Sequence, residues 1–152
     1  MEAKDVMTAP EQLETKVNCK IWVEVRGEVV FSQGRMRLLE AIEETGSISQ
    51  AAARMGMSYR AAWGKVTTTE GRLGLKLVER FPGHREHGAA LSETGRALLR
   101  QFQEFNRASQ ASVEDLFHKH MRGLIESLPP KAPSPVPLHP KTDDIQHAIP
   151  SD

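Results

Sequence analysis

The sequence has few of the features that stabilise secreted proteins or anchor membrane proteins. Cys19 is the only cysteine among 152 residues, so an internal disulfide is excluded. No stretch approaches the roughly 20 apolar residues of a membrane-spanning helix. The polar, mixed-charge residues from Met1 to Glu14 do not resemble an apolar signal peptide. These absences predict a cytoplasmic protein that does not bind a membrane.

Aromatic residues are also scarce, at 5% of the chain, whereas hydrophobic residues make up 39%. A chain of this length can form one ordinary domain with a tail. Because so few aromatic rings are available, we expect the core of that domain to be mostly aliphatic.

The formal net charge is zero, but the charges are unevenly distributed along the chain. From Ala51 to Arg85, seven basic minus two acidic side chains gives +5, whereas residues 1–50 carry −3 and residues 86–152 carry −2. A neutral protein with one basic segment is consistent with a local phosphate-binding surface. An ordinary solvated helix face would give the same count, so charge alone leaves both interpretations open.

Residues suited to catalysis or metal binding are not grouped in the sequence. No Ser/His/Asp set stands beside a Gly-rich turn, and no Gly-rich phosphate-binding motif occurs. The six histidines include no HxxxH pair, and there is no Cys/His cluster. We therefore expect no enzyme activity, no cofactor and no bound metal.

Residues 18–127 carry the periodic patterns of one folded domain. Within it, apolar residues alternate over 20–31 around a break at Arg26-Gly27, which predicts a two-stranded hairpin. Residues 1–17 are predicted to be a flexible leader. Residues 128–152 contain seven prolines and are predicted to be a disordered tail.

Residues 46–74 predict two short helices joined by a tight turn, which is a helix-turn-helix arrangement. Ser47 followed by Gln50 matches the capping-box pattern at the start of the first helix. Ser58 can cap the second helix, which is predicted over 59–73. Weak helix formers between Thr67 and Gly71 suggest that the C-terminal half of this second helix frays.

The second helix of such a pair enters the major groove of DNA, led by its N-terminal residues. Arg60 can donate two hydrogen bonds to guanine O6 and N7. Ser58 and Tyr59 can reach phosphate or base edges, whereas Lys65 suits a phosphate contact. Trp63 shares a face with Arg60 and either packs on sugar or a thymine methyl group, or belongs to the core.

A turn-rich basic loop over 80–88 lies between short strands predicted at 77–81 and 89–91, which together form a wing. Such a hairpin tip can lie along the DNA backbone or enter the minor groove, although a plain surface loop is the alternative. The backbone N–H groups at the start of the helix that Ser47 caps can bind a phosphate. The residues predicted to contact DNA are Ser47, Arg54, Ser58, Tyr59, Arg60, Trp63, Lys65, Arg80, His84 and Arg85.

Ser92 is predicted to cap the longest helix, which runs to about Ser127. Its apolar stripe is too long for one small domain to bury and would leave an exposed patch on a monomer. We therefore expect a two-fold homodimer formed through this helix. The residues predicted to form the dimer interface are Leu98, Phe102, Phe105, Leu116 and Leu124.

Three motifs carry a resemblance to a known family: "GRMRLLEAIEETGSISQAAARMGMSYRAAWGKV", "LGLKLVER" and "LSETGRALL". Together with the preceding "KIWVEVRGEVVF", they closely resemble the N-terminal DNA-binding domain of the ModE family of molybdate-responsive regulators. More distantly, "GSISQAAARMGMS" and "LSETGRALL" resemble the LysR-type winged helix.

The resemblance implies a mainly α fold with little β structure, namely a winged helix-turn-helix with an N-terminal β-hairpin and a long C-terminal dimerisation helix. It places a recognition helix at 59–73 and a wing at 80–88. Full-length members carry C-terminal domains that bind molybdate or tungstate, whereas a short Pro-rich segment follows the long helix here. We therefore expect neither molybdate nor tungstate to bind this chain directly.

These observations predict a sequence-specific transcriptional regulator that binds double-stranded DNA as a homodimer. The alternative is a winged-helix module that binds a protein partner and carries its basic face incidentally. The two differ in salt dependence, because binding to several phosphates weakens steeply as salt rises.

Overall fold

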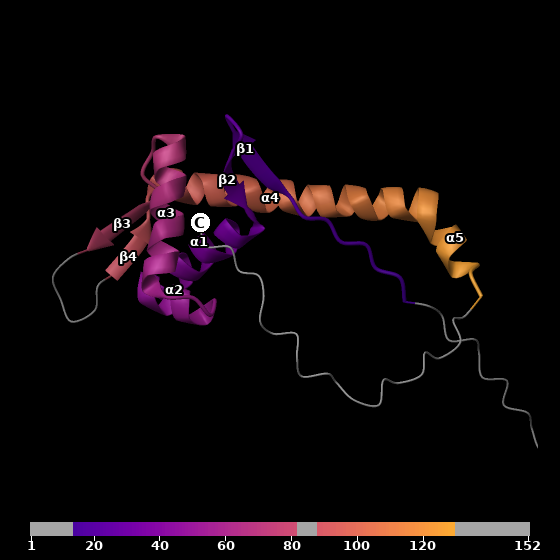
Figure 1. The fold of residues 1–152 in the computed structure, drawn as a ribbon, viewed down its shortest axis with the longest axis horizontal. Helices are drawn as coiled ribbons and strands as arrows, with labels where there is room; N and C mark the ends of the chain where they lie inside the picture. The colour runs from indigo at the N-terminus through magenta and orange to yellow at the C-terminus, as the bar shows by residue number, and fades with distance from the viewer. Residues whose placement is uncertain (1–13, 82–87, 130–152) are drawn as a thin grey trace, which may run out of the picture.

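The structure, a computed structural model, describes residues 14–81 and 88–129. The elements in chain order are β1 (Trp22–Val25), β2 (Glu28–Ser32), α1 (Gln33–Thr45), α2 (Ile48–Arg54), α3 (Tyr59–Leu73), β3 (Val78–Phe81), β4 (Gly88–Leu91), α4 (Glu93–Phe117), a π-helical turn (His118–Arg122) and α5 (Gly123–Glu126). Helices α1 to α3 and the two hairpins form a compact body, and α4 extends from it as a long rod (Figure 1).

The predicted N-terminal hairpin is confirmed, with β1 and β2 antiparallel and Val25 opposite Glu28. This register leaves Arg26 and Gly27 as a two-residue turn, in which both residues have positive φ, 54° and 78°. A turn of this kind matches the right-handed twist of the strands, and glycine adopts it without steric cost.

A serine side chain caps the N-terminus of each of the helices α1 to α4. The oxygen atoms of Ser47, Ser58 and Ser92 accept a hydrogen bond from the backbone N–H three residues later, which confirms the predicted caps. Ser32 caps α1 in the same way. The backbone N–H of Ser47, which a full capping box would satisfy through Gln50, instead donates to Oγ1 of Thr45 at 3.3 Å.

The core is mostly aliphatic, as the composition predicts, and it draws buried side chains from α1, α2, α3, the wing and α4. Its aromatic rings within the described residues are Phe31 and Phe102, which meet edge to face with centroids 4.7 Å apart. Ala51, Ala52 and Ala62 are at most 1% exposed. Small side chains therefore occupy the close approach of α2 to α3, where the helix-turn-helix interpretation expects them.

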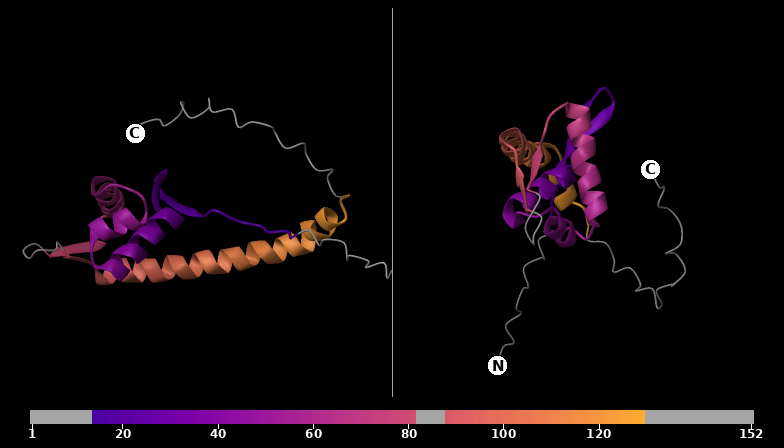
Figure 2. Two further views of the ribbon diagram at one scale, coloured as in Figure 1. Left: turned by 90° about the horizontal axis from the view of Figure 1, so that it is seen from below. Right: turned by 90° about the vertical axis from the view of Figure 1, so that its left-hand side faces the viewer.

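An extended segment precedes β1 and runs beside α4, away from the body (Figure 2). Its side chains alternate between exposed and half-buried, with Thr15, Val17 and Cys19 on the half-buried side. The side chain of Gln110 on α4 donates to the carbonyl of Val17 at 2.9 Å and accepts from the N–H of Cys19 at 3.4 Å. Residues 14–17, which the sequence assigns to a flexible leader, therefore lie along α4, and residues 1–13 fall outside the described ranges.

The end of the long helix differs from the sequence prediction of one helix to about Ser127. Regular α-helix stops at Phe117, and a π-helical turn separates it from α5. The π turn closes with an i to i+5 hydrogen bond, so it shifts the helical faces, and α5 bends away from the axis of α4 (Figure 1). No described helix is long and apolar enough to cross a membrane.

Candidate nucleic-acid interface

Helix α3 lies at the surface of the body and crosses the direction of α4 (Figure 1). Ala62, Val66 and Thr69 on its inner face are buried, at 3% exposure or less. Arg60 and Thr67 on the outer face are exposed. The second helix of the helix-turn-helix therefore turns its outer face toward solvent, as groove entry requires.

The N-terminal end of α3 is its most accessible part. Ser58, Tyr59 and Arg60 are all exposed. The hydroxyl oxygen of Ser58 accepts from the N–H of Ala61 at 3.1 Å, which leaves its O–H as a donor. Arg60 makes no ion pair with any described residue. These three predicted contact residues are brought together at one end of the helix.

Trp63 and Lys65 lie on opposite flanks of α3, because residues two apart are about 200° apart around a helix. Trp63 is half-buried and packs on the edge of the core. It is therefore neither a fully buried core residue nor a fully exposed side chain, the two alternatives that the sequence left open. On its outer side, the guanidinium carbon of Arg80 lies 4.8 Å from the ring centroid. Lys65 is exposed on the side nearer α1, where Arg35 and Lys65 line a small depression.

Helix α3 continues as regular helix to Leu73, so the predicted fraying of its C-terminal half is not observed. Hydrogen bonds from two arginine side chains stabilise this half despite its weak helix formers. Nε of Arg35 donates to Oγ1 of Thr69 at 2.8 Å, and Nη1 of Arg72 donates to the carbonyl of Val29 at 2.7 Å. The pKa of Arg35 lies below its ordinary value because of burial and, to a lesser extent, the charge of Arg72. These contacts join sequence-distant groups, so local propensity does not reveal them.

Glu70 connects α3 to the wing, a role that its neighbours in the sequence do not reveal. Its carboxylate oxygen accepts from the backbone N–H groups of Leu77 and Val78 at 2.8 and 3.1 Å. The side chain is 13% exposed and also lies 4.0 Å from Nζ of Lys76. An acidic residue one turn before the end of the helix, followed by a short strand, is the signal that could have suggested this link.

The remaining predicted contacts lie around α3. Ser47 is half-buried at the start of α2, and Arg54 at the end of α2 forms an ion pair with Glu44 of α1. Arg80 is exposed on β3, at the base of the wing. His84 and Arg85 lie outside the described residues.

Acidic side chains of α1 face a different side of the body. Glu43 pairs with Arg96 of α4 at 3.0 Å, and Glu40 accepts from the amide of Gln103 at 2.7 Å. These carboxylates contact side chains of α4, whereas Arg60 and Lys65 of α3 and Arg80 of β3 form no ion pair with any described residue. Across residues 14–81 and 88–129, no three His, Cys, Asp or Glu side chains are grouped as metal ligands would be.

A helix-turn-helix whose second helix is exposed, followed by an antiparallel β-hairpin, defines a winged helix-turn-helix domain. Residues 34–96 match the family described as the bacterial regulatory helix-turn-helix protein, lysR family. This segment is therefore similar to the helix-turn-helix domain of that family of bacterial regulatory proteins.

Curated relatives connect the domain to ModE and Mop proteins. The molybdenum-pterin-binding protein MopA of Rhodobacter capsulatus is 45% identical over 69 residues, which cover 45% of this chain and 26% of MopA. The molybdenum transport protein ModE of Azotobacter vinelandii is 36% identical over 87 residues, 57% of this chain and 32% of that protein. The transcriptional regulator ModE of Yersinia pestis is 34% identical over 83 residues, 54% and 32% of the two chains.

The chain therefore spans about a quarter to a third of the length of these relatives. Among solved structures, it is similar to the DNA-binding domain of CbnR in a DNA complex, with a TM-score of 0.48 and 24% identity over 57% of this chain and 94% of that chain.

Proposed function

We propose that this chain is a ModE-like, sequence-specific transcriptional regulator that binds double-stranded DNA in the cytoplasm as a homodimer. The observation that carries the proposal is the exposed N-terminal end of α3, where Arg60 has no ion-pair partner among the described residues. A bidentate guanidinium at the leading end of a recognition helix is the commonest specific reader of guanine.

The side chains around α3 supply the phosphate contacts in this proposal. Lys65 on one flank and Arg80 on the other would face the two backbones of the groove that α3 enters. Ser47 would present the first N–H groups of α2 to a phosphate, and Arg54 would exchange its pairing with Glu44 for a phosphate oxygen. His84 and Arg85 would extend the contact along the wing.

The salt dependence of binding and an unbiased selection test the function together. Selection of bound sequences from random duplex DNA should converge on one motif. Affinity for that motif should then fall steeply as salt rises, because each neutralised phosphate adds about 0.9 to the log–log slope. A selection that yields no motif, with an interaction that salt barely changes, would favour the protein-binding module instead.

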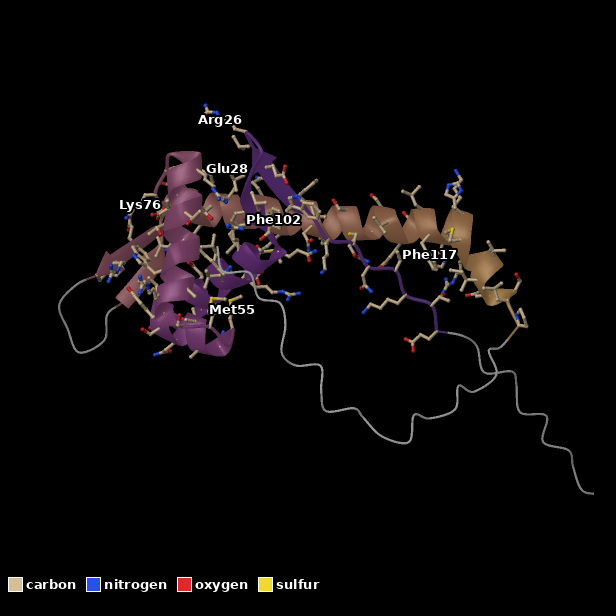
Figure 3. All side chains as sticks on the ribbon, in the orientation of Figure 1. Arg26, Glu28, Met55, Lys76, Phe102 and Phe117 are labelled. Carbon is tan, nitrogen blue, oxygen red and sulfur yellow. The ribbon has the colours of Figure 1, made fainter. Side chains whose placement is uncertain are left out.

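The dimer proposal rests on the parts of α4 and α5 that lie beyond the body. At 1.5 Å per residue, the 25 residues of α4 span roughly 37 Å. Phe105 and Leu116 on α4 are 50% and 56% exposed, Leu124 on α5 is 63% exposed, and Leu98 on α4 is half-buried. Phe102 is 4% exposed and packs on Phe31 inside the protomer, so we leave it out of the proposed interface. Figure 3 places Phe102 where α4 passes the hairpin, and Phe117 near the far end of the rod.

We expect light scattering at micromolar concentration to give the mass of two chains. Replacing both Leu116 and Leu124 with Asp should give the mass of one chain, because it places charges in the apolar contact. Ala111→Asp is the matched control, because Ala111 is exposed on α4 but lies about 120° or more around the helix from Phe105 and Leu116, and this variant should remain dimeric. A wild-type chain that is monomeric under these conditions would contradict the dimer.

A further inference from the structure

The side chains of Trp63 and Arg80 form a contact between the recognition helix and the wing. Trp63 extends from the first turns of α3, and Arg80 from β3, where it is paired in register with Ala89. The guanidinium carbon lies 4.8 Å from the centre of the indole ring, within the range of a cation–π contact. The two residues are 17 positions apart in the sequence, so the fold creates this pair.

The contact orders the guanidinium without using its hydrogen-bond donors. Arg80 is exposed, and no carboxylate in the described parts of the chain pairs with it. A guanidinium that lies over an aromatic ring keeps its in-plane N–H groups available for an anion. Trp63 itself packs on the edge of the core, so the surface that supports Arg80 is fixed.

We propose that Arg80 contacts a DNA phosphate and that Trp63 is the residue that positions it. This inference rests on the proposed DNA-binding function and assigns Trp63 a supporting role in place of a direct contact with sugar or base. A long arginine side chain loses rotamer freedom when it binds, and a side chain already held in place loses less. The ring therefore raises DNA affinity through Arg80 without touching DNA.

The test is a double-mutant cycle with the full chain on a duplex selected by the wild-type protein. Arg80→Gln keeps much of the side-chain stem but removes the charge, and it should lower affinity about tenfold per protomer. The slope of log affinity against log salt should fall by about 0.9 per protomer. Trp63→Leu keeps an apolar side chain against the core but removes the ring, and it should lower affinity about threefold.

The decisive measurement is the effect of Trp63→Leu when Arg80→Gln is already present. If the ring acts through Arg80, the second substitution should have no further effect on affinity. Trp63→Tyr, which restores a ring face, should recover most of the wild-type affinity. A loss on Trp63→Leu that is the same in both backgrounds, or that Trp63→Tyr does not recover, would overturn the proposal in favour of a packing role.

A measurement without DNA tests the contact itself. With Trp22 replaced by Phe, Trp63 is the remaining tryptophan, and Arg80→Gln should shift its fluorescence emission. An unchanged spectrum would contradict the contact. Wild-type protein that fails to bind any duplex would contradict the proposed function as well, whereas salt-sensitive binding without coupling between Trp63 and Arg80 would overturn this inference alone.

Discussion

Replacing Gly95 with Ala should destabilise the fold by roughly 3 kcal/mol or more. A Cβ atom at this position would lie 2.2 Å from the carbonyl oxygen of Leu77 and 3.1 Å from its carbonyl carbon. Both are backbone atoms, so no change of rotamer relieves the overlap. Gly95 is thus required because α4 packs directly against the backbone of Leu77, the residue that precedes β3.

The backbone of Leu77 cannot move away without losing other contacts. Its carbonyl accepts from the N–H of Ser92 at 2.8 Å, and its N–H donates to the carboxylate of Glu70 at 2.8 Å. Its side chain is 1% exposed. A displacement of this segment would therefore break these hydrogen bonds, each worth about 1 kcal/mol, in addition to the cost of overpacking.

Gly71→Ala in α3 is the matched control for this prediction. Gly71 also lies inside a helix, but a Cβ there meets no atom within 4 Å. Alanine is the better helix former, so this substitution should stabilise the protein by about 0.5–1 kcal/mol. Chemical unfolding of the two variants should move the midpoint in opposite directions. Equal stability of Gly95→Ala and the wild type would show that the close approach to Leu77 is absent in solution.

Local signals in the sequence were sufficient to predict most of the elements. Ser47, Ser58 and Ser92 mark helix starts because a hydroxyl oxygen satisfies an otherwise free N–H group within three residues. The turn at Arg26-Gly27 is predictable for a similar reason, since the two-residue loop needs positive φ. In both cases, the physical cause lies within a few residues of the signal.

The missed features depend on contacts between distant parts of the chain or on a change of helical period. Gln110 satisfies the backbone of Val17 across 93 residues, and Glu70 fixes the strand of the wing. The π turn after Phe117 interrupts a periodicity that the sequence alone interprets as one continuous helix. Within the candidate site, exposure of Arg60 follows from helical periodicity, whereas the pairing of Trp63 with Arg80 requires the packed fold.

Two positive side chains of α3, Arg60 and Lys65, lie on different sides of the helix although they are only five residues apart in the sequence. Arg60 is exposed in the first turn of the helix, on the face that points away from the core. Lys65 is exposed on the flank near Arg35, away from the centre of that face. A side chain on the central face reaches base edges, whereas one on the flank faces the phosphate backbone. The two residues should therefore differ in whether their removal changes sequence preference.

Replacing Arg60 with Ala should cost about 1–3 kcal/mol on the selected duplex and relax the preference at one base pair in each half-site. Binding to scrambled DNA should change much less. Arg60→Lys is the control for charge, because lysine keeps the positive charge but lacks the planar fork that pairs with guanine O6 and N7. It should lose the base preference while it retains most of the affinity for scrambled DNA.

Replacing Lys65 with Ala should weaken binding to selected and scrambled duplexes by the same factor and lower the salt slope by about 0.9 per protomer. Because the proposed dimer presents two copies of α3, the selected site should be a near-palindrome whose half-sites lie one helical turn, or a multiple, apart. The comparison of both variants on both duplexes decides between the roles. If Arg60→Ala loses affinity equally for the two DNAs, Arg60 is a backbone contact, and another residue on the outer face of α3 must read the base.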